Sequence, residues 1–147
     1  MQKRILEYKK RLEKIEELID ELLQQSKAGT IIIVEGKRDI VALRKLGIRG
    51  HVEAAAQKKL LEFSERIAND GKDIIILTDW DRRGDILSLK LTTYLRDLGN
   101  DPDLLIRERL RSLVKKEIKD VESLFTYVVK LRNITGYTEK SHPAHNY

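Results

Sequence analysis

The strongest constraint on the fold is the regular exchange between short apolar runs and amphipathic stretches. The runs at residues 31–34 (IIIV) and 73–77 (DIIIL) consist almost entirely of isoleucine, valine and leucine, and a weaker run, HVEAA, lies at 51–55. Runs of the first kind are typical of strands that are buried on both faces. A helical pattern follows each run. The resulting β-α-β-α-β-α order predicts an α/β fold, a Rossmann-like parallel sheet flanked by helices on both faces.

Three helices are expected to cover this sheet. The first is capped by Asp39 and ends at Gly47, the second spans residues 58–69, and the third spans residues 85–98. The apolar residues expected to face inward from these helices are Ile40, Val41, Leu43, Leu46, Leu60, Leu61, Phe63, Ile67, Ile86, Leu89, Tyr94 and Leu98.

An amphipathic helix is predicted to precede the sheet, over residues 2–25. Its apolar residues recur at steps of three and four, and they are Ile5, Tyr8, Leu12, Ile15, Ile19 and Leu22, with Leu18 and Leu23 widening the stripe. This stripe packs either on the helix's own domain or against a second copy in a coiled coil. We therefore expect a monomer, or a homodimer formed through this helix.

The region after residue 100 is less regular. Residues 101–115 read mainly as a helix that starts near Pro102 and runs to Val114, with a fourth strand at 104–107 as the alternative. Residues 116–136 predict a final helix capped by Asp120. The division expected is thus an N-terminal helix (1–28), an α/β domain (29–115), a C-terminal helix (116–136) and a flexible tail (137–147).

Composition narrows the class of protein. A chain of 147 residues is normally one domain. The sequence has no cysteine and no apolar run long enough for a membrane span, so we expect a cytoplasmic protein without disulfides, thiolate zinc sites or a membrane partner. Its net charge of +5 is compatible with a polyanionic partner such as nucleic acid.

Acidic residues follow the two strongest predicted strands. Glu35 comes directly after the first, and Asp79 and Asp81 come after the other. Ligands of open α/β sheets bind at the carboxyl ends of the strands. Residues i and i+2 of an extended chain point the same way, so the two aspartates share one side while Trp80 faces the other. Carboxylates so placed are candidate ligands for Mg²⁺, which combines few carboxylates with water and substrate phosphate.

Basic residues and glycines surround these acids. Arg82, Arg83 and Lys37 are candidate phosphate ligands. Gly84 permits a sharp turn or a close approach to a ligand, beside the amides that open the next helix. The alternative is that Asp79 and Asp81 only end a strand and cap a helix, and that the arginines are solvated. Trp80 is expected to pack in the core, although base stacking stays open.

The segments VEGKRD (34–39) and LTDWDRRGD (77–85) together resemble the Toprim domain. This metal-binding module is shared by topoisomerases, bacterial-type primases and several nucleases. Glu35, Gly36 and Asp39 match its first motif, and residues 79–85 match D-x-D-R-E-G-E with Arg83 for Glu and Asp85 for the last Glu. The resemblance covers roughly residues 30–110, and the whole chain looks like the small stand-alone Toprim proteins of archaea.

The resemblance implies roles for these residues. Glu35 would be a general acid or base, Asp79 and Asp81 would bind Mg²⁺ or Mn²⁺, and Asp85 would be a weaker third acid. Gly36 and Gly84 would lie beside the bound phosphate, with Asp39 in support. The expected activity is that of a Mg²⁺-dependent phosphodiester enzyme, a nuclease acting on RNA or DNA. The alternatives are a nucleic-acid or ribonucleoprotein binding module that does not cleave, and a small-phosphate hydrolase or nucleotidyl transferase.

Overall fold

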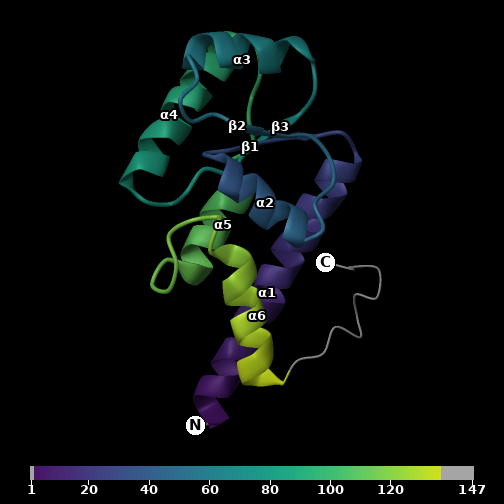
Figure 1. The fold of residues 1–147 in the computed structure, drawn as a ribbon, viewed down its shortest axis with the longest axis vertical. Coiled ribbons are helices and arrows are strands. Elements are labelled where there is room, and N and C mark those ends of the chain that lie inside the picture. The colour runs from purple at the N-terminus through teal and green to yellow at the C-terminus, as the bar shows by residue number, and fades with distance from the viewer. Residues whose placement is uncertain (1, 137–147) are drawn as a thin grey trace.

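The computed structural model describes residues 2–136, so the expected tail at 137–147 lies outside the described residues. Three strands and six helices alternate along this part of the chain (Figure 1). They are α1 (Gln2–Lys27), β1 (Ile31–Val34), α2 (Lys37–Lys45), β2 (Val52–Ala54), α3 (Leu60–Asn69), β3 (Ile74–Ile76), α4 (Arg82–Asp97), α5 (Leu105–Val114) and α6 (Leu124–Thr135).

The strands form one parallel sheet in the order β2-β1-β3. β1 is central, and it pairs Ile33 with Glu53 of β2 and with Ile76 of β3. A parallel sheet of this order brings the carboxyl ends of all three strands to one edge. The predicted α/β fold with a parallel, helix-flanked sheet is confirmed.

Successive residues of the strands face two different cores. Ile31, Ile33, Ile74 and Ile76 pack on one side with residues of α3 and α4. Ile32, Val34, Ile75 and Leu77 pack on the other side with residues of α1, α2, α5 and α6. Figure 1 shows this division, with α3 and α4 above the sheet and the other helices below it. Burial on both faces explains why the strand sequences are continuous apolar runs rather than alternating ones.

The apolar stripe of α1 is buried within its own chain. Leu12, Ile15, Ile19 and Leu22 are each at most 2% exposed, and the helix packs against α5 and α6. An ion pair between Glu16 and Arg132, at 2.7 Å, joins α1 to α6 inside this contact. The apolar side chains that could have formed a coiled coil are therefore packed within their own chain. Leu6 on the same helix is 55% exposed.

Replacing Leu12 by Ala is expected to lower the free energy of unfolding by about 3 kcal/mol, because the change leaves a cavity in the core. Leu6→Ala is the matched control on the same helix, and it should change stability by less than about 0.5 kcal/mol. Denaturant unfolding of the two variants measures both values. Equal stability of the two would contradict the packing of α1, and the mass of each variant in solution would show whether a dimer depends on this stripe.

Several helix predictions need correction. α3 begins at Leu60 rather than at residue 58, and α4 begins at Arg82 rather than at residue 85. Five residues expected to face inward are more than 40% exposed: Val41, Leu61, Ile86, Leu89 and Leu98. In α4 the buried residues are Gly84, Ser88, Leu91, Thr92 and Leu95. Small polar residues share the buried face, and a search for apolar residues alone therefore found the wrong side of the helix.

The segment after α4 contains a helix and a minimal extension of the sheet. Asp103 forms an isolated parallel bridge with Ile75, and α5 follows from Leu105. The helix expected in residues 101–115 is confirmed, with a later start than predicted, and a strand at 104–107 is wrong. The last helix, α6, begins only at Leu124, because residues 118–121 are hydrogen-bonded to the end of β3. Asp120 caps a turn by accepting from the Ser123 amide at 2.8 Å.

Within residues 2–136, no helix has both the length and the apolar character that crossing a bilayer requires.

Candidate metal and phosphodiester site

The sheet places Glu35 and Asp79 at the ends of neighbouring strands. The amide of Leu77 donates to the carbonyl of Ile33 at 2.7 Å, so the hydrogen bonding between β1 and β3 reaches one residue past Ile76. Glu35 and Asp79 each follow two residues later. The two acids expected at this edge from the sequence are thus brought together by strand pairing.

One oxygen of the Glu35 carboxylate is buried without a partner. Its Oε1 is shielded from solvent and accepts no hydrogen bond from any described residue. Burial raises the pKa of Glu35, and the charge of Asp81 raises it further, while the charge of Arg83 and a hydrogen bond with the Asp79 side chain oppose the shift. A buried acceptor without a donor is costly unless something outside the protein satisfies it. This oxygen is therefore suited to a proton, a bound water or a cation.

Asp79 is the most perturbed acid of the site. Its side chain is 9% exposed, and its Oδ1 accepts a 3.0 Å hydrogen bond from the amide of Val121. Burial raises the pKa of Asp79 to about 7, and the charges of Asp39 and Glu35 add to the effect against the opposing hydrogen bond. In the absence of a cation, this carboxyl group therefore holds its proton up to near-neutral pH.

The raised pKa of Asp79 predicts a pH dependence of stability. The folded state holds the proton of Asp79 more tightly than the unfolded state does. The resulting contribution of Asp79 to the free energy of unfolding is complete below about pH 4, and it is lost as the pH rises through about 7. Asp79→Asn should therefore stabilise the metal-free protein at pH 8, by up to about 4 kcal/mol, and change it little at pH 4. Thermal unfolding at both pH values measures the difference. Asp70→Asn, at the exposed end of α3, is the control, and an equal effect at both pH values would contradict the assignment.

Asp81 is the N-cap of α4. Its Oδ1 accepts from the Gly84 amide at 2.8 Å. A carboxylate at this position is stabilised by the helix dipole and by the free amides of the first turn. The capping part of the alternative sequence interpretation therefore holds for Asp81. Its second oxygen accepts no hydrogen bond from residues 2–136, and its charge raises the pKa of Glu35.

Gly84 fits closely against the end of β3. A Cβ atom at this position would collide with the backbone carbonyl of Asp79. The side chain of Thr78 completes the contact by donating to the carbonyl of Gly84 at 2.8 Å. The close approach foreseen at Gly84 is therefore made to the protein's own strand, and it fixes how far Asp81 lies from Asp79.

Gly84→Ala is expected to destabilise the protein by about 2 kcal/mol or more, because strand and helix must separate to admit the methyl group. Gly36→Ala serves as the control, since its nearest contact would be an ordinary 4.0 Å from Asp39. Denaturant midpoints of both variants give the comparison. Equal midpoints would show that α4 does not lie this close to the strand.

A buried arginine that the sequence reasoning missed supports the strand end. Arg107 of α5 is 2% exposed, and its guanidinium donates to the carbonyls of Thr78 and Asp79 at 2.9 and 2.6 Å. It also pairs with Asp85 at 2.7 Å. Arg111 donates to both oxygens of Asp85, at 2.8 and 3.1 Å. Burial by itself would raise the pKa of Asp85, but the hydrogen bonds and charges of Arg107 and Arg111 together lower it. The carboxylate of Asp85 is therefore held by the two arginines.

Residues 118–121 bring a further acid to the cluster. Trp80 is 3% exposed, as expected for a core residue, and its indole Nε1 donates to the carbonyl of Ile118 at 2.8 Å. This contact and the Val121 bond hold the connection after α5 against the strand end. The charge of Asp120 consequently raises the pKa values of Asp79 and Asp39. The sequence suggested only a helix cap at Asp120.

The basic residues predicted from the sequence border the acids. Lys37, Arg82 and Arg83 are all exposed at the starts of α2 and α4. Asp39 is 5% exposed, and its Oδ2 accepts from the Gly36 amide at 2.9 Å. It therefore caps α2 from within the first turn, and its pKa is raised by burial. Gly36 and Asp39 thus set the turn that leads from Glu35 into the helix.

The acids of the candidate site all lie inside one region that matches a known family. A family model described as the Toprim domain matches residues 30–122. The chain belongs to the Toprim domain family. The match confirms the resemblance seen in the two motifs, and it extends beyond residue 110 to include Asp120.

This Toprim protein is also similar to whole proteins of known sequence or structure. It is 58% identical over 133 residues to a UPF0292 protein of Methanosarcina barkeri, covering 90% of this chain and 93% of that protein. It is 60% identical over 129 residues to a UPF0292 protein of Methanosarcina acetivorans, covering 88% and 90%. A solved structure of a "putative protein from Aquifex aeolicus" matches with a TM-score of 0.64 and 29% identity, over 74% of this chain and 95% of that one.

Membership in the Toprim family points to a metal-dependent function related to nucleic acids, since Toprim domains typically bind Mg²⁺. Among residues 2–136, no three Asp, Glu or His side chains are grouped closely enough to bind a metal by themselves. Mg²⁺ commonly needs only one or two carboxylates, because water and substrate phosphate complete its shell. The partnerless oxygen of Glu35 and the neighbouring Asp79 and Asp81 fit this requirement.

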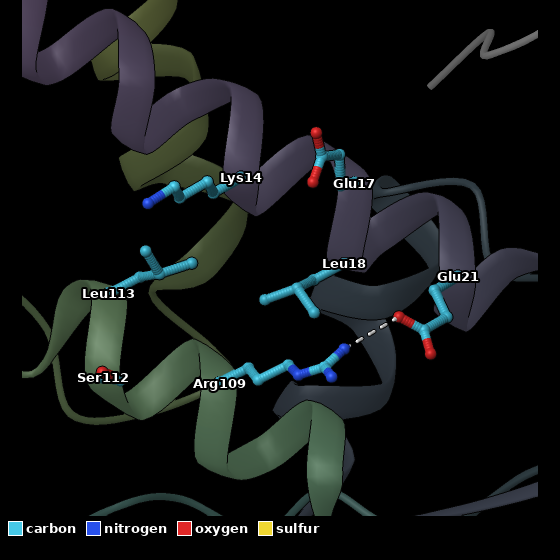
Figure 2. Close-up of a pocket in the computed structure, with 7 residues that line it drawn as sticks. All are labelled: Lys14, Glu17, Leu18, Glu21, Arg109, Ser112 and Leu113. Carbon is cyan, nitrogen blue, oxygen red and sulfur yellow. Dashed lines mark ion pairs between the residues drawn. The ribbon is translucent and has the colours of Figure 1, made fainter.

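A second feature of the Toprim protein lies apart from these acids. α1 and α5 border a depression of about 370 Å³ (Figure 2). Leu18 and Leu113 line it, and Arg109 pairs with Glu21 at 3.8 Å across one end. The depression shares no lining residue with the acidic site, so it contributes nothing to the chemistry considered below.

Proposed function

We propose that this Toprim protein is a Mg²⁺-dependent phosphodiester enzyme, a nuclease that acts on RNA or DNA. The observation that supports this most is the buried, partnerless Oε1 of Glu35 beside the perturbed Asp79 at the adjoining strand end. Two carboxyl groups with raised pKa values in one place are typical of sites that move protons or bind cations. Structural ion pairs would instead lower such values.

We assign the metal to Asp79 and Asp81. Asp79 can offer its Oδ2 while Oδ1 keeps the bond from Val121, and Asp81 can offer Oδ2 while Oδ1 caps α4. When bound, Mg²⁺ or Mn²⁺ would polarise a phosphoryl oxygen and neutralise charge on the phosphate. Asp85 is proposed to orient α4 through Arg107 and Arg111 instead of binding the metal, because both of its oxygens already accept hydrogen bonds.

Glu35 is proposed to move the proton of the reaction. As its carboxylate, it takes a proton at Oε1 from the attacking water, whose oxygen forms the new bond to phosphorus. The bond from phosphorus to the ester oxygen breaks, and that oxygen leaves as an alkoxide that takes a proton from solvent water. A pKa above the ordinary value makes the carboxylate a stronger base for this step. Lys37, Arg82 and Arg83 are proposed to hold the phosphate, with the backbone at Gly36 nearby.

Incubation with labelled RNA and DNA panels tests the proposal, in Mg²⁺, in Mn²⁺ and in chelator. We expect cleavage with either metal and none in chelator. Glu35→Gln, under the same conditions, guards against a contaminating nuclease. Metal-dependent binding of RNA or DNA without cleavage would show a binding module instead of an enzyme. Neither binding nor cleavage of either nucleic acid would favour a small phosphate substrate.

A further inference from the structure

The loop between β2 and α3 lies beside Glu35. Its residues Gln57 and Lys58 border two depressions, and we call these two residues the crest. The amide of Ala55 donates to the carbonyl of Val34 at 3.0 Å, and the amide of Ala56 donates to the carbonyl of Glu35 itself at 2.8 Å. The amide of Lys58 closes a tight turn on the carbonyl of Ala55 at 3.2 Å. The loop is therefore fixed to the backbone of the residue that is proposed to move the proton.

Two depressions flank this crest. One has a volume of about 280 Å³ and is lined by Glu35 and Arg83 together with loop residues that include Lys58. The other has a volume of about 450 Å³ and is lined by Gly36 and Lys37 together with Gln57 and Lys58. Lys58 thus borders both depressions, and a cationic side chain lies on each side of it.

The backbone of the crest is unusual. Gln57 has a φ of +62°, and it is the one non-glycine residue of the described chain with a positive φ. The left-handed region costs a residue with a side chain roughly 1 kcal/mol, and Gln lacks the local bonding that helps Asn and Asp adopt it. Strain of this kind often marks sites where a loop must present its residues to a ligand.

The charges on the crest are available to a ligand. Lys37 and Lys58 are exposed and form no ion pair with any residue from 2 to 136. The described side chains that line the two depressions include no aromatic ring, and Trp80 is buried. Contacts with bases by stacking are thus not offered here, whereas contacts with phosphates are.

We infer that the Gln57–Lys58 crest is a binding site for the sugar–phosphate backbone of one nucleic-acid strand, which runs from Arg83 and Glu35 across Lys58 to Lys37. This inference rests on the proposed function, and it adds Lys58 as the residue that holds a phosphate next to the one being attacked. The binding does not depend on base identity. Gln57 positions Lys58 by turning the chain at the crest.

Exchange of one lysine at a time tests the inference. Lys58→Glu should weaken binding of a single-stranded oligonucleotide of about 20 nucleotides by about tenfold or more. Lys59→Glu, one residue further on, changes the net charge equally but lies outside both depressions, and should weaken it by less than about threefold. Fluorescence anisotropy in Mg²⁺ with Glu35→Gln as the background measures affinity without cleavage. Both lysines are exposed, so thermal unfolding of the variants should be unchanged.

Salt and a second variant make the test specific. Lys58→Ala should lower the slope of log affinity against log salt by about 0.7 for a single strand, the value of one phosphate contact. Gln57→Gly keeps the turn but removes the side chain, and should leave the affinity unchanged. If Gln57→Gly weakens binding as much as Lys58→Glu, the side chain of Gln57 contributes as much as the Lys58 charge, and the assignment to Lys58 fails.

The failure of this inference is distinguishable from failure of the proposed function. Equal affinities of Lys58→Glu and Lys59→Glu, with metal-dependent cleavage by the unaltered protein, would overturn the crest and leave the nuclease in place. An unaltered protein that neither binds nor cleaves either nucleic acid would overturn both.

Discussion

Glu35→Gln is expected to lower the turnover of nucleic-acid cleavage by about 10² to 10⁴, the usual contribution of a general acid or base. Gln keeps the shape of the side chain but cannot accept the proton at the position of Oε1. Oε1 accepts no hydrogen bond from the described residues, and a Gln side chain can keep the hydrogen bond that Glu35 shares with the Asp79 side chain. Single-turnover rates at saturating Mg²⁺ separate the chemical step from substrate binding.

A matched substitution checks this expectation. Glu62→Gln on α3 makes the same chemical change at an exposed position, and its turnover should equal that of the unaltered protein. The pH profile adds a second readout, since loss of the base should remove the acidic limb of the rate. Full turnover by Glu35→Gln would assign the proton transfer to another group.

Asp79→Asn and Asp81→Asn are each expected to weaken Mg²⁺ binding by about 100-fold or more, because each removes a hard anionic ligand. Both changes preserve local structure. An amide oxygen at 79 can still accept from the Val121 amide, and Asn is as good an N-cap as Asp at 81. Loss of metal affinity without loss of folding would therefore report on ligation itself.

Asp85→Asn should behave in the opposite way. It leaves the proposed ligands in place, so Mg²⁺ affinity should change by less than about threefold. It also removes a charged partner from the buried Arg107, which is expected to cost about 2 kcal/mol or more of stability. Calorimetric Mg²⁺ titration and denaturant unfolding of this variant measure the two effects. A large loss of Mg²⁺ affinity would return Asp85 to the metal site.

The sheet could be predicted from the sequence because its strands are short, apolar and buried on both faces. The run at 31–34 identifies a buried strand by composition alone. The faces of the helices were harder, because α4 buries Ser88 and Thr92 and exposes Leu89. The phase of that helix is set by the contact between Gly84 and Asp79, a tertiary constraint that apolar periodicity does not contain.

The residues of the candidate site likewise fall into those that local sequence predicts and those that only tertiary contacts bring to the site. Glu35, Asp79 and Asp81 could be predicted because Glu35 lies directly after β1 and the two aspartates lie three and five residues after β3. Arg107 and Asp120 could not, since they reach the strand end from segments 28 and more residues away in sequence. The one local signal for Arg107 was its place between the buried Ile106 and Leu110 on an otherwise amphipathic helix. Lys58 had no signal beyond its charge, because only the fold places its loop on Glu35.

Titration of Mg²⁺ into the metal-free protein at pH 8 tests the central claim most directly, with Asp79→Asn and Asp81→Asn beside the Asp70→Asn control. We expect binding to the unaltered protein and to Asp70→Asn with equal affinity, and a loss of about 100-fold or more in the two site variants. A second titration of the unaltered protein at pH 7 should show proton release on binding, since at that pH the metal displaces the proton of Asp79. Equal Mg²⁺ affinity in all four proteins would contradict the site and leave Asp79 and Asp81 as a strand end and a helix cap.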